Sequence, residues 1–317
     1  MKNTIIQGIK IDWDKIDQDS YLRQIPSLKN LQSLEFSKEV TFFVGENGTG
    51  KSTFIKRFME SLVLPNMGEG YSRERARDEM PQSAAGKTVM TTEPKFIPDE
   101  AVTIHLDDSA NMRVKMIDCV GYIVPEALGT IENGQPRMVR TPWSEEPMPF
   151  VEAAEMGTHK VITEHATIGM LITTDGTIGE ISRESYIEAE ERVVRELKAL
   201  GKPFAMILNS ARPSSEDAVA LAYELEAKYD VPVALVSCMD LDAEDIRHIL
   251  ELVLHEIPVA EVRVRLPEWT TALEPTHRIH AELMSRLRRS ADRVHRIGDI
   301  RDAFSDFAEC EFVESAE

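Results

Sequence analysis

The residues with the clearest chemical signature form a glycine-rich run near the start of the chain. Gly45-Glu46-Asn47-Gly48-Thr49-Gly50-Lys51-Ser52 fits the pattern G-x-x-x-x-G-K-[ST] in full and is followed by Thr53. Such glycines let backbone N–H groups surround phosphate oxygens, while the lysine reaches the β- and γ-phosphates and the serine hydroxyl coordinates Mg²⁺. The run predicts that residues 45–53 bind a nucleoside triphosphate, and the alternative is an ordinary Gly-rich turn.

A triphosphate site also needs a carboxylate near the metal, and Asp118 fits that role. It ends the apolar run Val114-Lys115-Met116-Ile117 and is followed by Cys119-Val120-Gly121. A carboxylate at the tip of a neighbouring strand holds Mg²⁺ in such sites. We therefore predict Asp118 to be a catalytic residue and metal ligand, and we expect the Gly121 N–H to contact the γ-phosphate. The alternative is that Asp118 is a turn or cap residue.

Hydroxyl groups are unusually dense in the stretch before Asp118, where Thr91 and Thr92 are adjacent. P-loop switch proteins place a threonine from such a loop on Mg²⁺. We predict catalytic or γ-phosphate-sensing roles for both threonines and a metal contact for Thr91. From the residues alone, turn-forming threonines are an equally good interpretation.

The preference for a base is predicted from a missing carboxylate. GTP-specific switch proteins carry Asn-Lys-x-Asp, but here Asn209-Ser210-Ala211 is followed by Arg212. A site that loses its paired acceptor loses discrimination, so we predict ATP, or weak base selectivity, and we include Asn209 among the nucleotide-binding residues. Tyr122 occupies the place of the glutamine that orients water in Ras-like proteins, which predicts slow intrinsic hydrolysis.

The elements that must position these residues alternate along the chain. Strands followed in rotation by helices predict an α/β fold with a mainly parallel sheet and helices on both faces. Residues 64–98 and 119–149 are expected to be long connections, 260–266 a further strand, and the tail from Pro267 mostly helical. Strands are expected at 40–44, 102–106, 114–118, 168–173, 204–208 and 231–237, and helices at 50–61, 151–165, 186–200, 214–229 and 242–255.

Apolar residues recur at near-helical spacing between positions 275 and 300, with arginines between them. Two interpretations remain open: a helix whose apolar stripe packs on its own domain, and a helix that binds a surface or a partner. The apolar residues are Ile279, Leu283, Leu287, Val294 and Ile297.

Composition narrows the class of protein. The chain has 317 residues, 36 Lys and Arg against 55 Asp and Glu, and a formal net charge of -19. This acidic balance argues against nucleic acid as a partner. The three cysteines are too scattered for a disulfide framework, and we find neither a signal peptide nor an apolar run that could span a bilayer. We expect a cytoplasmic protein.

From Phe54 to Ala316 the chain closely resembles the stage IV sporulation protein A family. The similarity is carried by long, specific strings rather than by generic P-loop sequence. They are Phe54-Ile55-Lys56-Arg57-Phe58-Met59-Glu60, Leu64-Pro65-Asn66, Arg73-Glu74-Arg75-Ala76-Arg77-Asp78-Glu79, Pro81-Gln82-Ser83-Ala84-Ala85-Gly86-Lys87-Thr88, Met90-Thr91-Thr92-Glu93-Pro94-Lys95-Phe96, Asp118-Cys119-Val120-Gly121-Tyr122, Pro136-Arg137-Met138, Thr141-Pro142-Trp143 and Tyr186-Ile187-Glu188-Ala189-Glu190-Glu191-Arg192.

The resemblance implies a GTPase-like (TRAFAC-type) P-loop fold that hydrolyses ATP with Mg²⁺ and uses hydrolysis to self-assemble as the basement layer of the bacterial spore coat. It implies a location in the mother-cell cytoplasm at the outer forespore surface, with coat or membrane-anchor proteins as partners. By position it makes Lys51 the P-loop lysine, Asp118 the Walker B aspartate, and Thr91 and Thr92 the paired sensor threonines.

Residues 1–53 resemble instead the start of ABC-type AAA ATPases, so the chain reads as two P-loop proteins joined inside the shared motif. We expect a lead-in segment at 1–39, a P-loop NTPase domain at 40–258 and a strand plus helical extension at 259–317, the start of a truncated middle domain. Two alternative functions remain: an ABC/AAA-type ATPase, and a nucleotide-binding scaffold with little turnover.

Overall fold

The structure is a computed structural model that describes residues 8–10, 33–35, 40–46, 48–81, 94–105, 111–124, 127, 129–132, 134–264 and 266–313. Within them, six strands form the central sheet in the order β12-β11-β10-β3-β5-β4. The strands are β3 (Val40–Val44), β4 (Lys95–His105), β5 (Asn111–Asp118), β10 (Ile168–Thr174), β11 (Phe204–Asn209) and β12 (Val233–Val236).

Five of these strands are parallel, and only β4 at the edge runs antiparallel to its neighbour β5. The mainly parallel α/β fold predicted from the alternating pattern is therefore confirmed. All seven residues of β10 are buried, as expected for a central strand that is covered on both faces.

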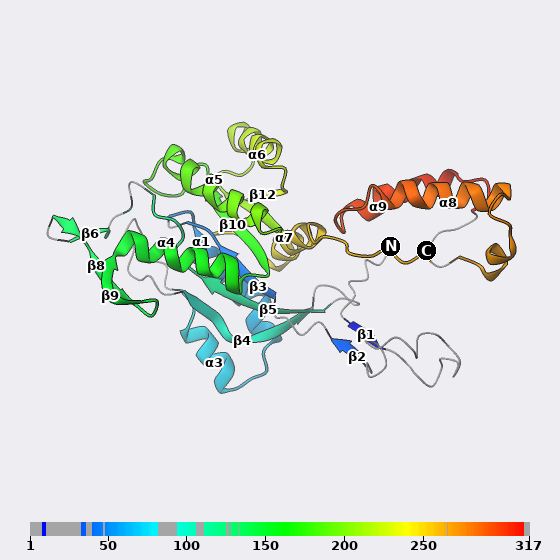
Figure 1. The fold of residues 1–317 in the computed structure, drawn as a ribbon. Helices are drawn as coiled ribbons and strands as arrows, with labels where there is room; N and C mark the ends of the chain where they lie inside the picture. Colours follow the sequence, from blue (N-terminus) through cyan, green and yellow to red (C-terminus); the bar gives the residue numbers. More distant parts are fainter. Residues whose placement is uncertain are drawn as a thin grey trace.

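Helices cover both faces of the sheet (Figure 1). The helices of the main body are α1 (Lys51–Phe58), α4 (Phe150–Lys160), α5 (Arg183–Ala199), α6 (Glu216–Tyr229) and α7 (Ala243–His255). The side chains of β10 alternate between two cores: Met170 and Ile172 pack with α1 and α7, whereas Leu171 packs with α4, α5 and α6. This alternation follows from the period of two in a strand.

Two of these helices, α6 and α7, begin at the capping residues predicted from the sequence. Ser215 accepts a hydrogen bond from the Ala218 N–H at 3.3 Å and caps α6. Asp242 and Asp245 form a reciprocal capping box at the start of α7. Both satisfy backbone donors that the first turn of a helix leaves unpaired.

Two predicted connections contain regular structure, so the prediction of long loops there was wrong in part. The stretch 64–98 includes α2 (Leu64–Asn66), α3 (Tyr71–Asp78) and the start of β4. Helix α3 buries only Ala76, so it leaves no apolar periodicity to detect. The stretch 119–149 contains the hairpins β6 (Ile131–Glu132) with β7 (Gln135–Pro136) and β8 (Met138–Thr141) with β9 (Ser144–Pro149).

Other boundaries also differ. The helix predicted at 151–165 is α-helical only as far as Lys160 and ends in a π-helical turn, η4 (Val161–His165). Helix α1 likewise continues into a π-helical turn, η3 (Met59–Val63). The ammonium of Lys202 donates to the carbonyls of Ile162, Thr163 and Ala166 at the end of η4, which satisfies groups that a helix end leaves unpaired.

Earlier in the chain than the central sheet, β1 (Gly8–Lys10) pairs antiparallel with β2 (Ser33–Glu35).

The C-terminal part packs on itself and joins the body at the end of α7. The prediction of a strand at 260–266 was wrong. The described residues of that range form no strand, and Val262 and Val264 are exposed. Without a neighbouring strand, a β-branched run gains nothing from extension. The tail contains η5 (Glu268–Ala272), α8 (Arg278–Ala291), α9 (Asp299–Ala303) and η6 (Ser305–Glu309).

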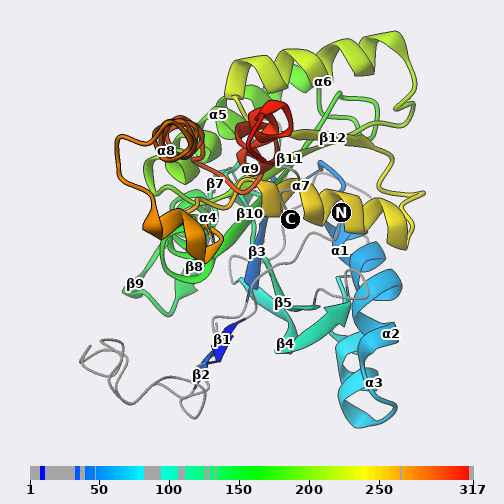
Figure 2. The same ribbon diagram turned by 90° about the vertical axis from the view of Figure 1, so that its right-hand side faces the viewer.

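The amphipathic stripe of the tail is explained by local packing. Ile279, Leu283 and Leu287 on α8 pack with Phe307 and Cys310 in a small separate core. The tail is tied to the body by backbone hydrogen bonds such as Gly298 N to the His255 carbonyl at 3.0 Å. It lies beyond α7 in Figure 1 and is seen in front of the body in Figure 2. The helix itself ends at Ala291, well before the predicted end near residue 300.

Candidate nucleotide-binding site

The predicted phosphate-binding loop connects β3 to α1 at the carboxyl edge of the sheet. Gly48 and Gly50 have φ angles of 84° and 89°, a region that glycine enters without the steric cost other residues meet. A Cβ on Gly50 would lie 2.1 Å from Nδ2 of Asn209. Only glycine therefore fits at this point of the loop, as the sequence pattern requires.

Lys51 is the first residue of α1, and its side chain is buried beside Asp118. The ammonium lies 3.2 Å from Oδ1 of Asp118 and also donates to the Cys119 carbonyl. The two residues meet because β3 and β5 are adjacent and parallel, with Val44 paired to Asp118. Burial alone would lower the pKa of Lys51, but the Asp118 carboxylate together with the neighbouring Cys119 and Glu46 outweighs that effect, and the pKa is raised. Lys51 is thus held as a buried cation at the loop.

Asn209 supports the loop from the other side. Its side chain is 2% exposed, donates to the Thr49 carbonyl at 2.9 Å and accepts from the Cys238 N–H at 2.9 Å. Both polar groups of the amide are thereby used within the protein. Asn209 joins the loop to the ends of β11 and β12, and its direct contact with nucleotide stays a prediction. Arg212, three residues further on, is exposed.

Glu46 is a feature that the sequence did not reveal. We predicted it only as one of the loop positions, but its side chain is 2% exposed, and neither carboxylate oxygen has a hydrogen-bond partner among the described residues. It lies against Gly121, where a Cβ would approach Glu46 Oε2 to 2.3 Å. Burial raises the pKa of Glu46 to about 8. A proton is therefore held next to the phosphate loop at neutral pH.

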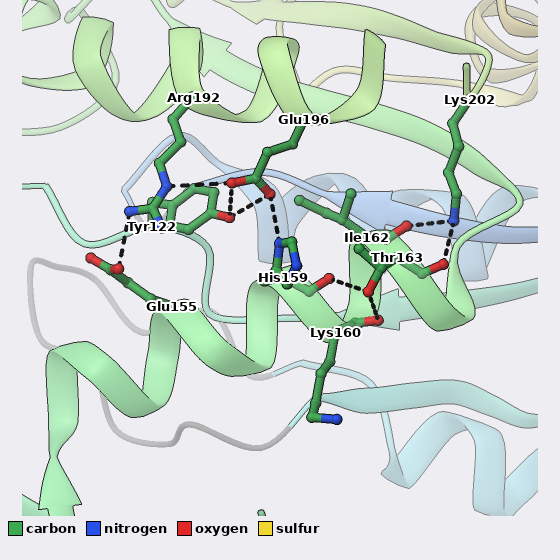
Figure 3. Close-up of polar contacts among 9 residues, drawn as sticks. All are labelled: Tyr122, Glu155, His159, Lys160, Ile162, Thr163, Arg192, Glu196 and Lys202. Atoms are coloured by element: carbon green, nitrogen blue, oxygen red, sulfur yellow. Dashed lines mark hydrogen bonds and ion pairs between the residues drawn. The ribbon is translucent and has the colours of Figure 1, made fainter. Parts of the chain in front are cut away.

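Tyr122 begins in the same turn, but its side chain leaves the site. The ring is 3% exposed and lies between α4 and α5, where its hydroxyl donates to Glu196 at 2.6 Å (Figure 3). Burial, with the neighbouring Glu196 carboxylate, raises the pKa of Tyr122, so the phenol is neutral. The side chain is thus directed between α4 and α5, with its hydroxyl engaged by Glu196.

Several predicted residues fall outside the described part of the chain. Asn47 of the loop and the threonines Thr91 and Thr92 are among them, so their roles stay predictions. Ser52 and Thr53 follow Lys51 in α1 and are half-buried, whereas Thr49 is buried and donates to the Glu46 carbonyl at 2.7 Å. The structure brings together Gly45, Glu46, Gly48, Thr49, Gly50, Lys51, Asp118, Gly121 and Asn209.

Two consecutive parts of the chain match models of one protein family. Residues 39–258 match the family model for the ATPase domain of stage IV sporulation protein A, and residues 259–317 match the model for the middle domain of the same protein. The chain belongs to the stage IV sporulation protein A family. All the described site residues lie in the part that matches the ATPase domain of this family.

Curated stage IV sporulation protein A sequences give the same result. The chain is 50% identical over 273 residues to the protein of Bacillus subtilis (strain 168), 48% over 271 residues to that of Clostridioides difficile (strain 630) and 49% over 273 residues to that of Bacillus anthracis. These alignments cover 86% of this chain and 55% or 56% of the relatives. The chain thus spans about half the length of the curated relatives it matches.

Among the solved structures that align is that of a mutant of NFeoB from S. thermophilus bound to GDP. It has a TM-score of 0.34 and 11% identity, covering 87% of this chain and 82% of that chain. A similarity at this level supports no inference about the site.

The family match tests the resemblances predicted for the two parts of the chain. Similarity to stage IV sporulation protein A, expected for residues 54–316, is confirmed, and the match to its ATPase domain begins before the glycine-rich loop. The resemblance of residues 1–53 to ABC-type AAA ATPases stays a prediction. Among the described residues, no helix combines the length and the apolar character needed to cross a membrane.

Proposed function

We propose that this chain binds ATP at the loop formed by residues 45–53 and hydrolyses it with the help of Mg²⁺. The single observation that carries the proposal is the buried Lys51 ammonium, 3.2 Å from the Asp118 carboxylate at the ends of two adjacent parallel strands. A lysine and an aspartate in this relation are the charged groups that a P-loop site uses for phosphates and for metal. The match to an ATPase domain supports the same reaction.

The charges of the site suit a triphosphate with its metal. Lys51 and Asp118 neutralise each other in the protein described here. A bound triphosphate would offer Lys51 a stronger set of acceptors and leave the carboxylate, whose side chain is 20% exposed, available as an oxygen ligand. Ser52, Asp118 and, by prediction, Thr91 would hold Mg²⁺, which prefers oxygen ligands and supplies positive charge to the phosphates.

The roles of the remaining loop residues follow from their placement. Backbone N–H groups of residues 45–52 would bind phosphate oxygens, and the N-terminus of α1 adds its partial positive charge. Gly121 would contribute its N–H at the γ-phosphate. Asn209 keeps the loop in place, and Arg212 in place of an aspartate favours ATP over strict selection of GTP.

Hydrolysis is tested by measuring phosphate release from the purified chain with ATP and Mg²⁺. We expect turnover that is lost in Lys51→Ala and Asp118→Asn, with folding checked by circular dichroism. A wild-type rate equal to that of Lys51→Ala would refute the proposal. Isothermal titration with ATP and GTP tests the base preference, and tighter binding of GTP would contradict it.

A second candidate function is a nucleotide-binding scaffold with little turnover. The observation that favours it is the buried Tyr122 ring, which places no amide beside the γ-phosphate position. ATP binding without phosphate release above that of Lys51→Ala would support this alternative.

We infer the biological role from the family. Self-assembly as the basement layer of the spore coat, on the outer forespore surface in the mother-cell cytoplasm, with coat or membrane-anchor proteins as partners, is the role we propose. The family name and its middle domain support a place in sporulation. Sedimentation with and without ATP tests assembly: we expect ATP-dependent pelleting, and its absence would contradict self-assembly by this chain.

A further inference from the structure

The side chain of Tyr122 is held by two charged groups of α5, although its backbone follows β5 at the candidate site. The guanidinium of Arg192, on α5, lies 3.9 Å from the centre of the Tyr122 ring. The Tyr122 hydroxyl donates to the carboxylate of Glu196, one turn further along α5, at 2.6 Å. A cation on the ring face and a carboxylate on the hydroxyl each favour this one position of the ring.

The same two residues of α5 also bind α4. Arg192 forms an ion pair with Glu155 at 3.0 Å, and Glu196 lies 3.3 Å from Nδ1 of His159. Figure 3 shows the Tyr122 ring between the two helices, with Arg192 and Glu196 on one and Glu155 and His159 on the other. Displacing the ring would therefore disturb contacts between α4 and α5 as well as its own. We call Tyr122, Arg192, Glu196, Glu155 and His159 the tyrosine clamp.

The turn is confined on its other side by the phosphate loop. Gly121 has a φ of 82° and leaves no room for a Cβ, because Oε2 and Cα of Glu46 would lie 2.3 and 2.9 Å from it. Gly121 thus sits between the loop and a residue whose ring is clamped. The backbone at Gly121, whose N–H we expect to contact the γ-phosphate, is therefore confined from both directions.

We propose that Arg192 is a positioning residue for nucleotide hydrolysis, which acts through Tyr122 to set the place of the Gly121 N–H. This inference rests on the proposed function. It assigns Arg192 no contact with nucleotide. Because a small misplacement of a group that acts in the transition state lowers the rate more than it lowers binding, the effect of losing Arg192 falls on kcat.

The test uses the full chain and compares kcat and KM for ATP, with the Kd of a fluorescent ATP analogue measured separately. For Arg192→Ala we expect kcat to fall roughly tenfold, while KM and Kd stay within about twofold because the phosphate loop is untouched. Arg192→Lys, which keeps a cation near the ring and Glu155, should recover most of the rate. Tyr122→Phe, which keeps the ring under Arg192 but loses the bond to Glu196, should give an intermediate kcat.

The matched control is Glu191→Gln, which removes an ion pair of α5 with Lys228 at 2.7 Å and leaves the tyrosine clamp intact. It should keep the wild-type kcat. Equal kcat values in wild type, Arg192→Ala and Tyr122→Phe would overturn this inference alone. A fall in kcat accompanied by an equal rise in the Kd for the ATP analogue would also overturn it. If Arg192→Ala does not fold, Arg192→Lys and Tyr122→Phe decide in its place. A wild-type chain no faster than Lys51→Ala would instead overturn the proposed function, and this inference with it.

Discussion

Replacing Glu46 by glutamine should stabilise the protein, and the gain should depend on pH. The Glu46 carboxyl is buried with no hydrogen-bond partner among the described residues, and its pKa is raised from 4.5 to about 8. The folded protein therefore keeps a proton that the unfolded chain loses once the pH exceeds 4.5. Folding must take up this proton, so stability falls as the pH rises from the unfolded pKa to the folded one.

The size of the effect follows from the two pKa values. Each pKa unit corresponds to about 1.4 kcal/mol, so at pH 7 the carboxyl lowers the free energy of unfolding by about 3 kcal/mol. Above pH 8 the loss levels off at about 5 kcal/mol. Glutamine has nearly the same shape and carries no charge at any of these pH values. Glu46→Gln should thus recover the ionisation cost.

Thermal unfolding of both chains at pH 5, 6, 7 and 8 measures the difference. For a domain of this size 1 kcal/mol corresponds to roughly 2–4 °C in Tm, so we expect Glu46→Gln to melt roughly 6–12 °C higher at pH 7. At pH 5 the gain should be small. Glu224→Gln, at an exposed position of α6, removes the same charge and should leave Tm nearly unchanged. A difference that is constant with pH, or a destabilised Glu46→Gln, would refute the reasoning.

Two further substitutions test the support of the phosphate loop. Gly50→Ala places a Cβ 2.1 Å from Asn209 Nδ2 at a φ of 89°. We expect this substitution to lower the free energy of unfolding in urea by at least about 1–2 kcal/mol and to weaken ATP binding. The control Gly68→Ala, whose Cβ meets no atom within 4 Å, should do neither. Asn209→Ala leaves the Thr49 carbonyl and the Cys238 N–H without their partner and should cost about 1–3 kcal/mol; unchanged urea midpoints would show that the amide does not support the loop.

The local pattern of the sequence was sufficient for the outline of the fold. Alternating strands and helices gave the mainly parallel sheet because apolar periodicity is a property of each element by itself. The glycine-rich run was placed at the end of a strand and the start of a helix because its own residues require that geometry. Asp118 was found because it follows an apolar strand, and the adjacency of β3 and β5 then put it beside Lys51.

Elements without an apolar stripe were missed for the same reason. Helix α3 buries one residue and shows no periodicity. The run at 260–266 shows the opposite error, because strand-like residues form a strand only where a sheet offers them a neighbour. The arginine-rich tail gave two interpretations that only the packing of Leu283 against Phe307 could separate.

The tertiary structure alone decided how the loop is supported. In the sequence, Glu46 occupies a variable position of the motif. Its side chain packs against Gly121, which follows the neighbouring strand β5. Asn209 reaches Thr49 across 160 positions, and Tyr122 meets Glu196 across 74. Periodicity and motif spacing describe neighbours along the chain, whereas these contacts depend on which strands are adjacent and which helices cover them. The amino-acid sequence thus determined the chemistry at the sheet edge, and packing determined which side chains hold it in place.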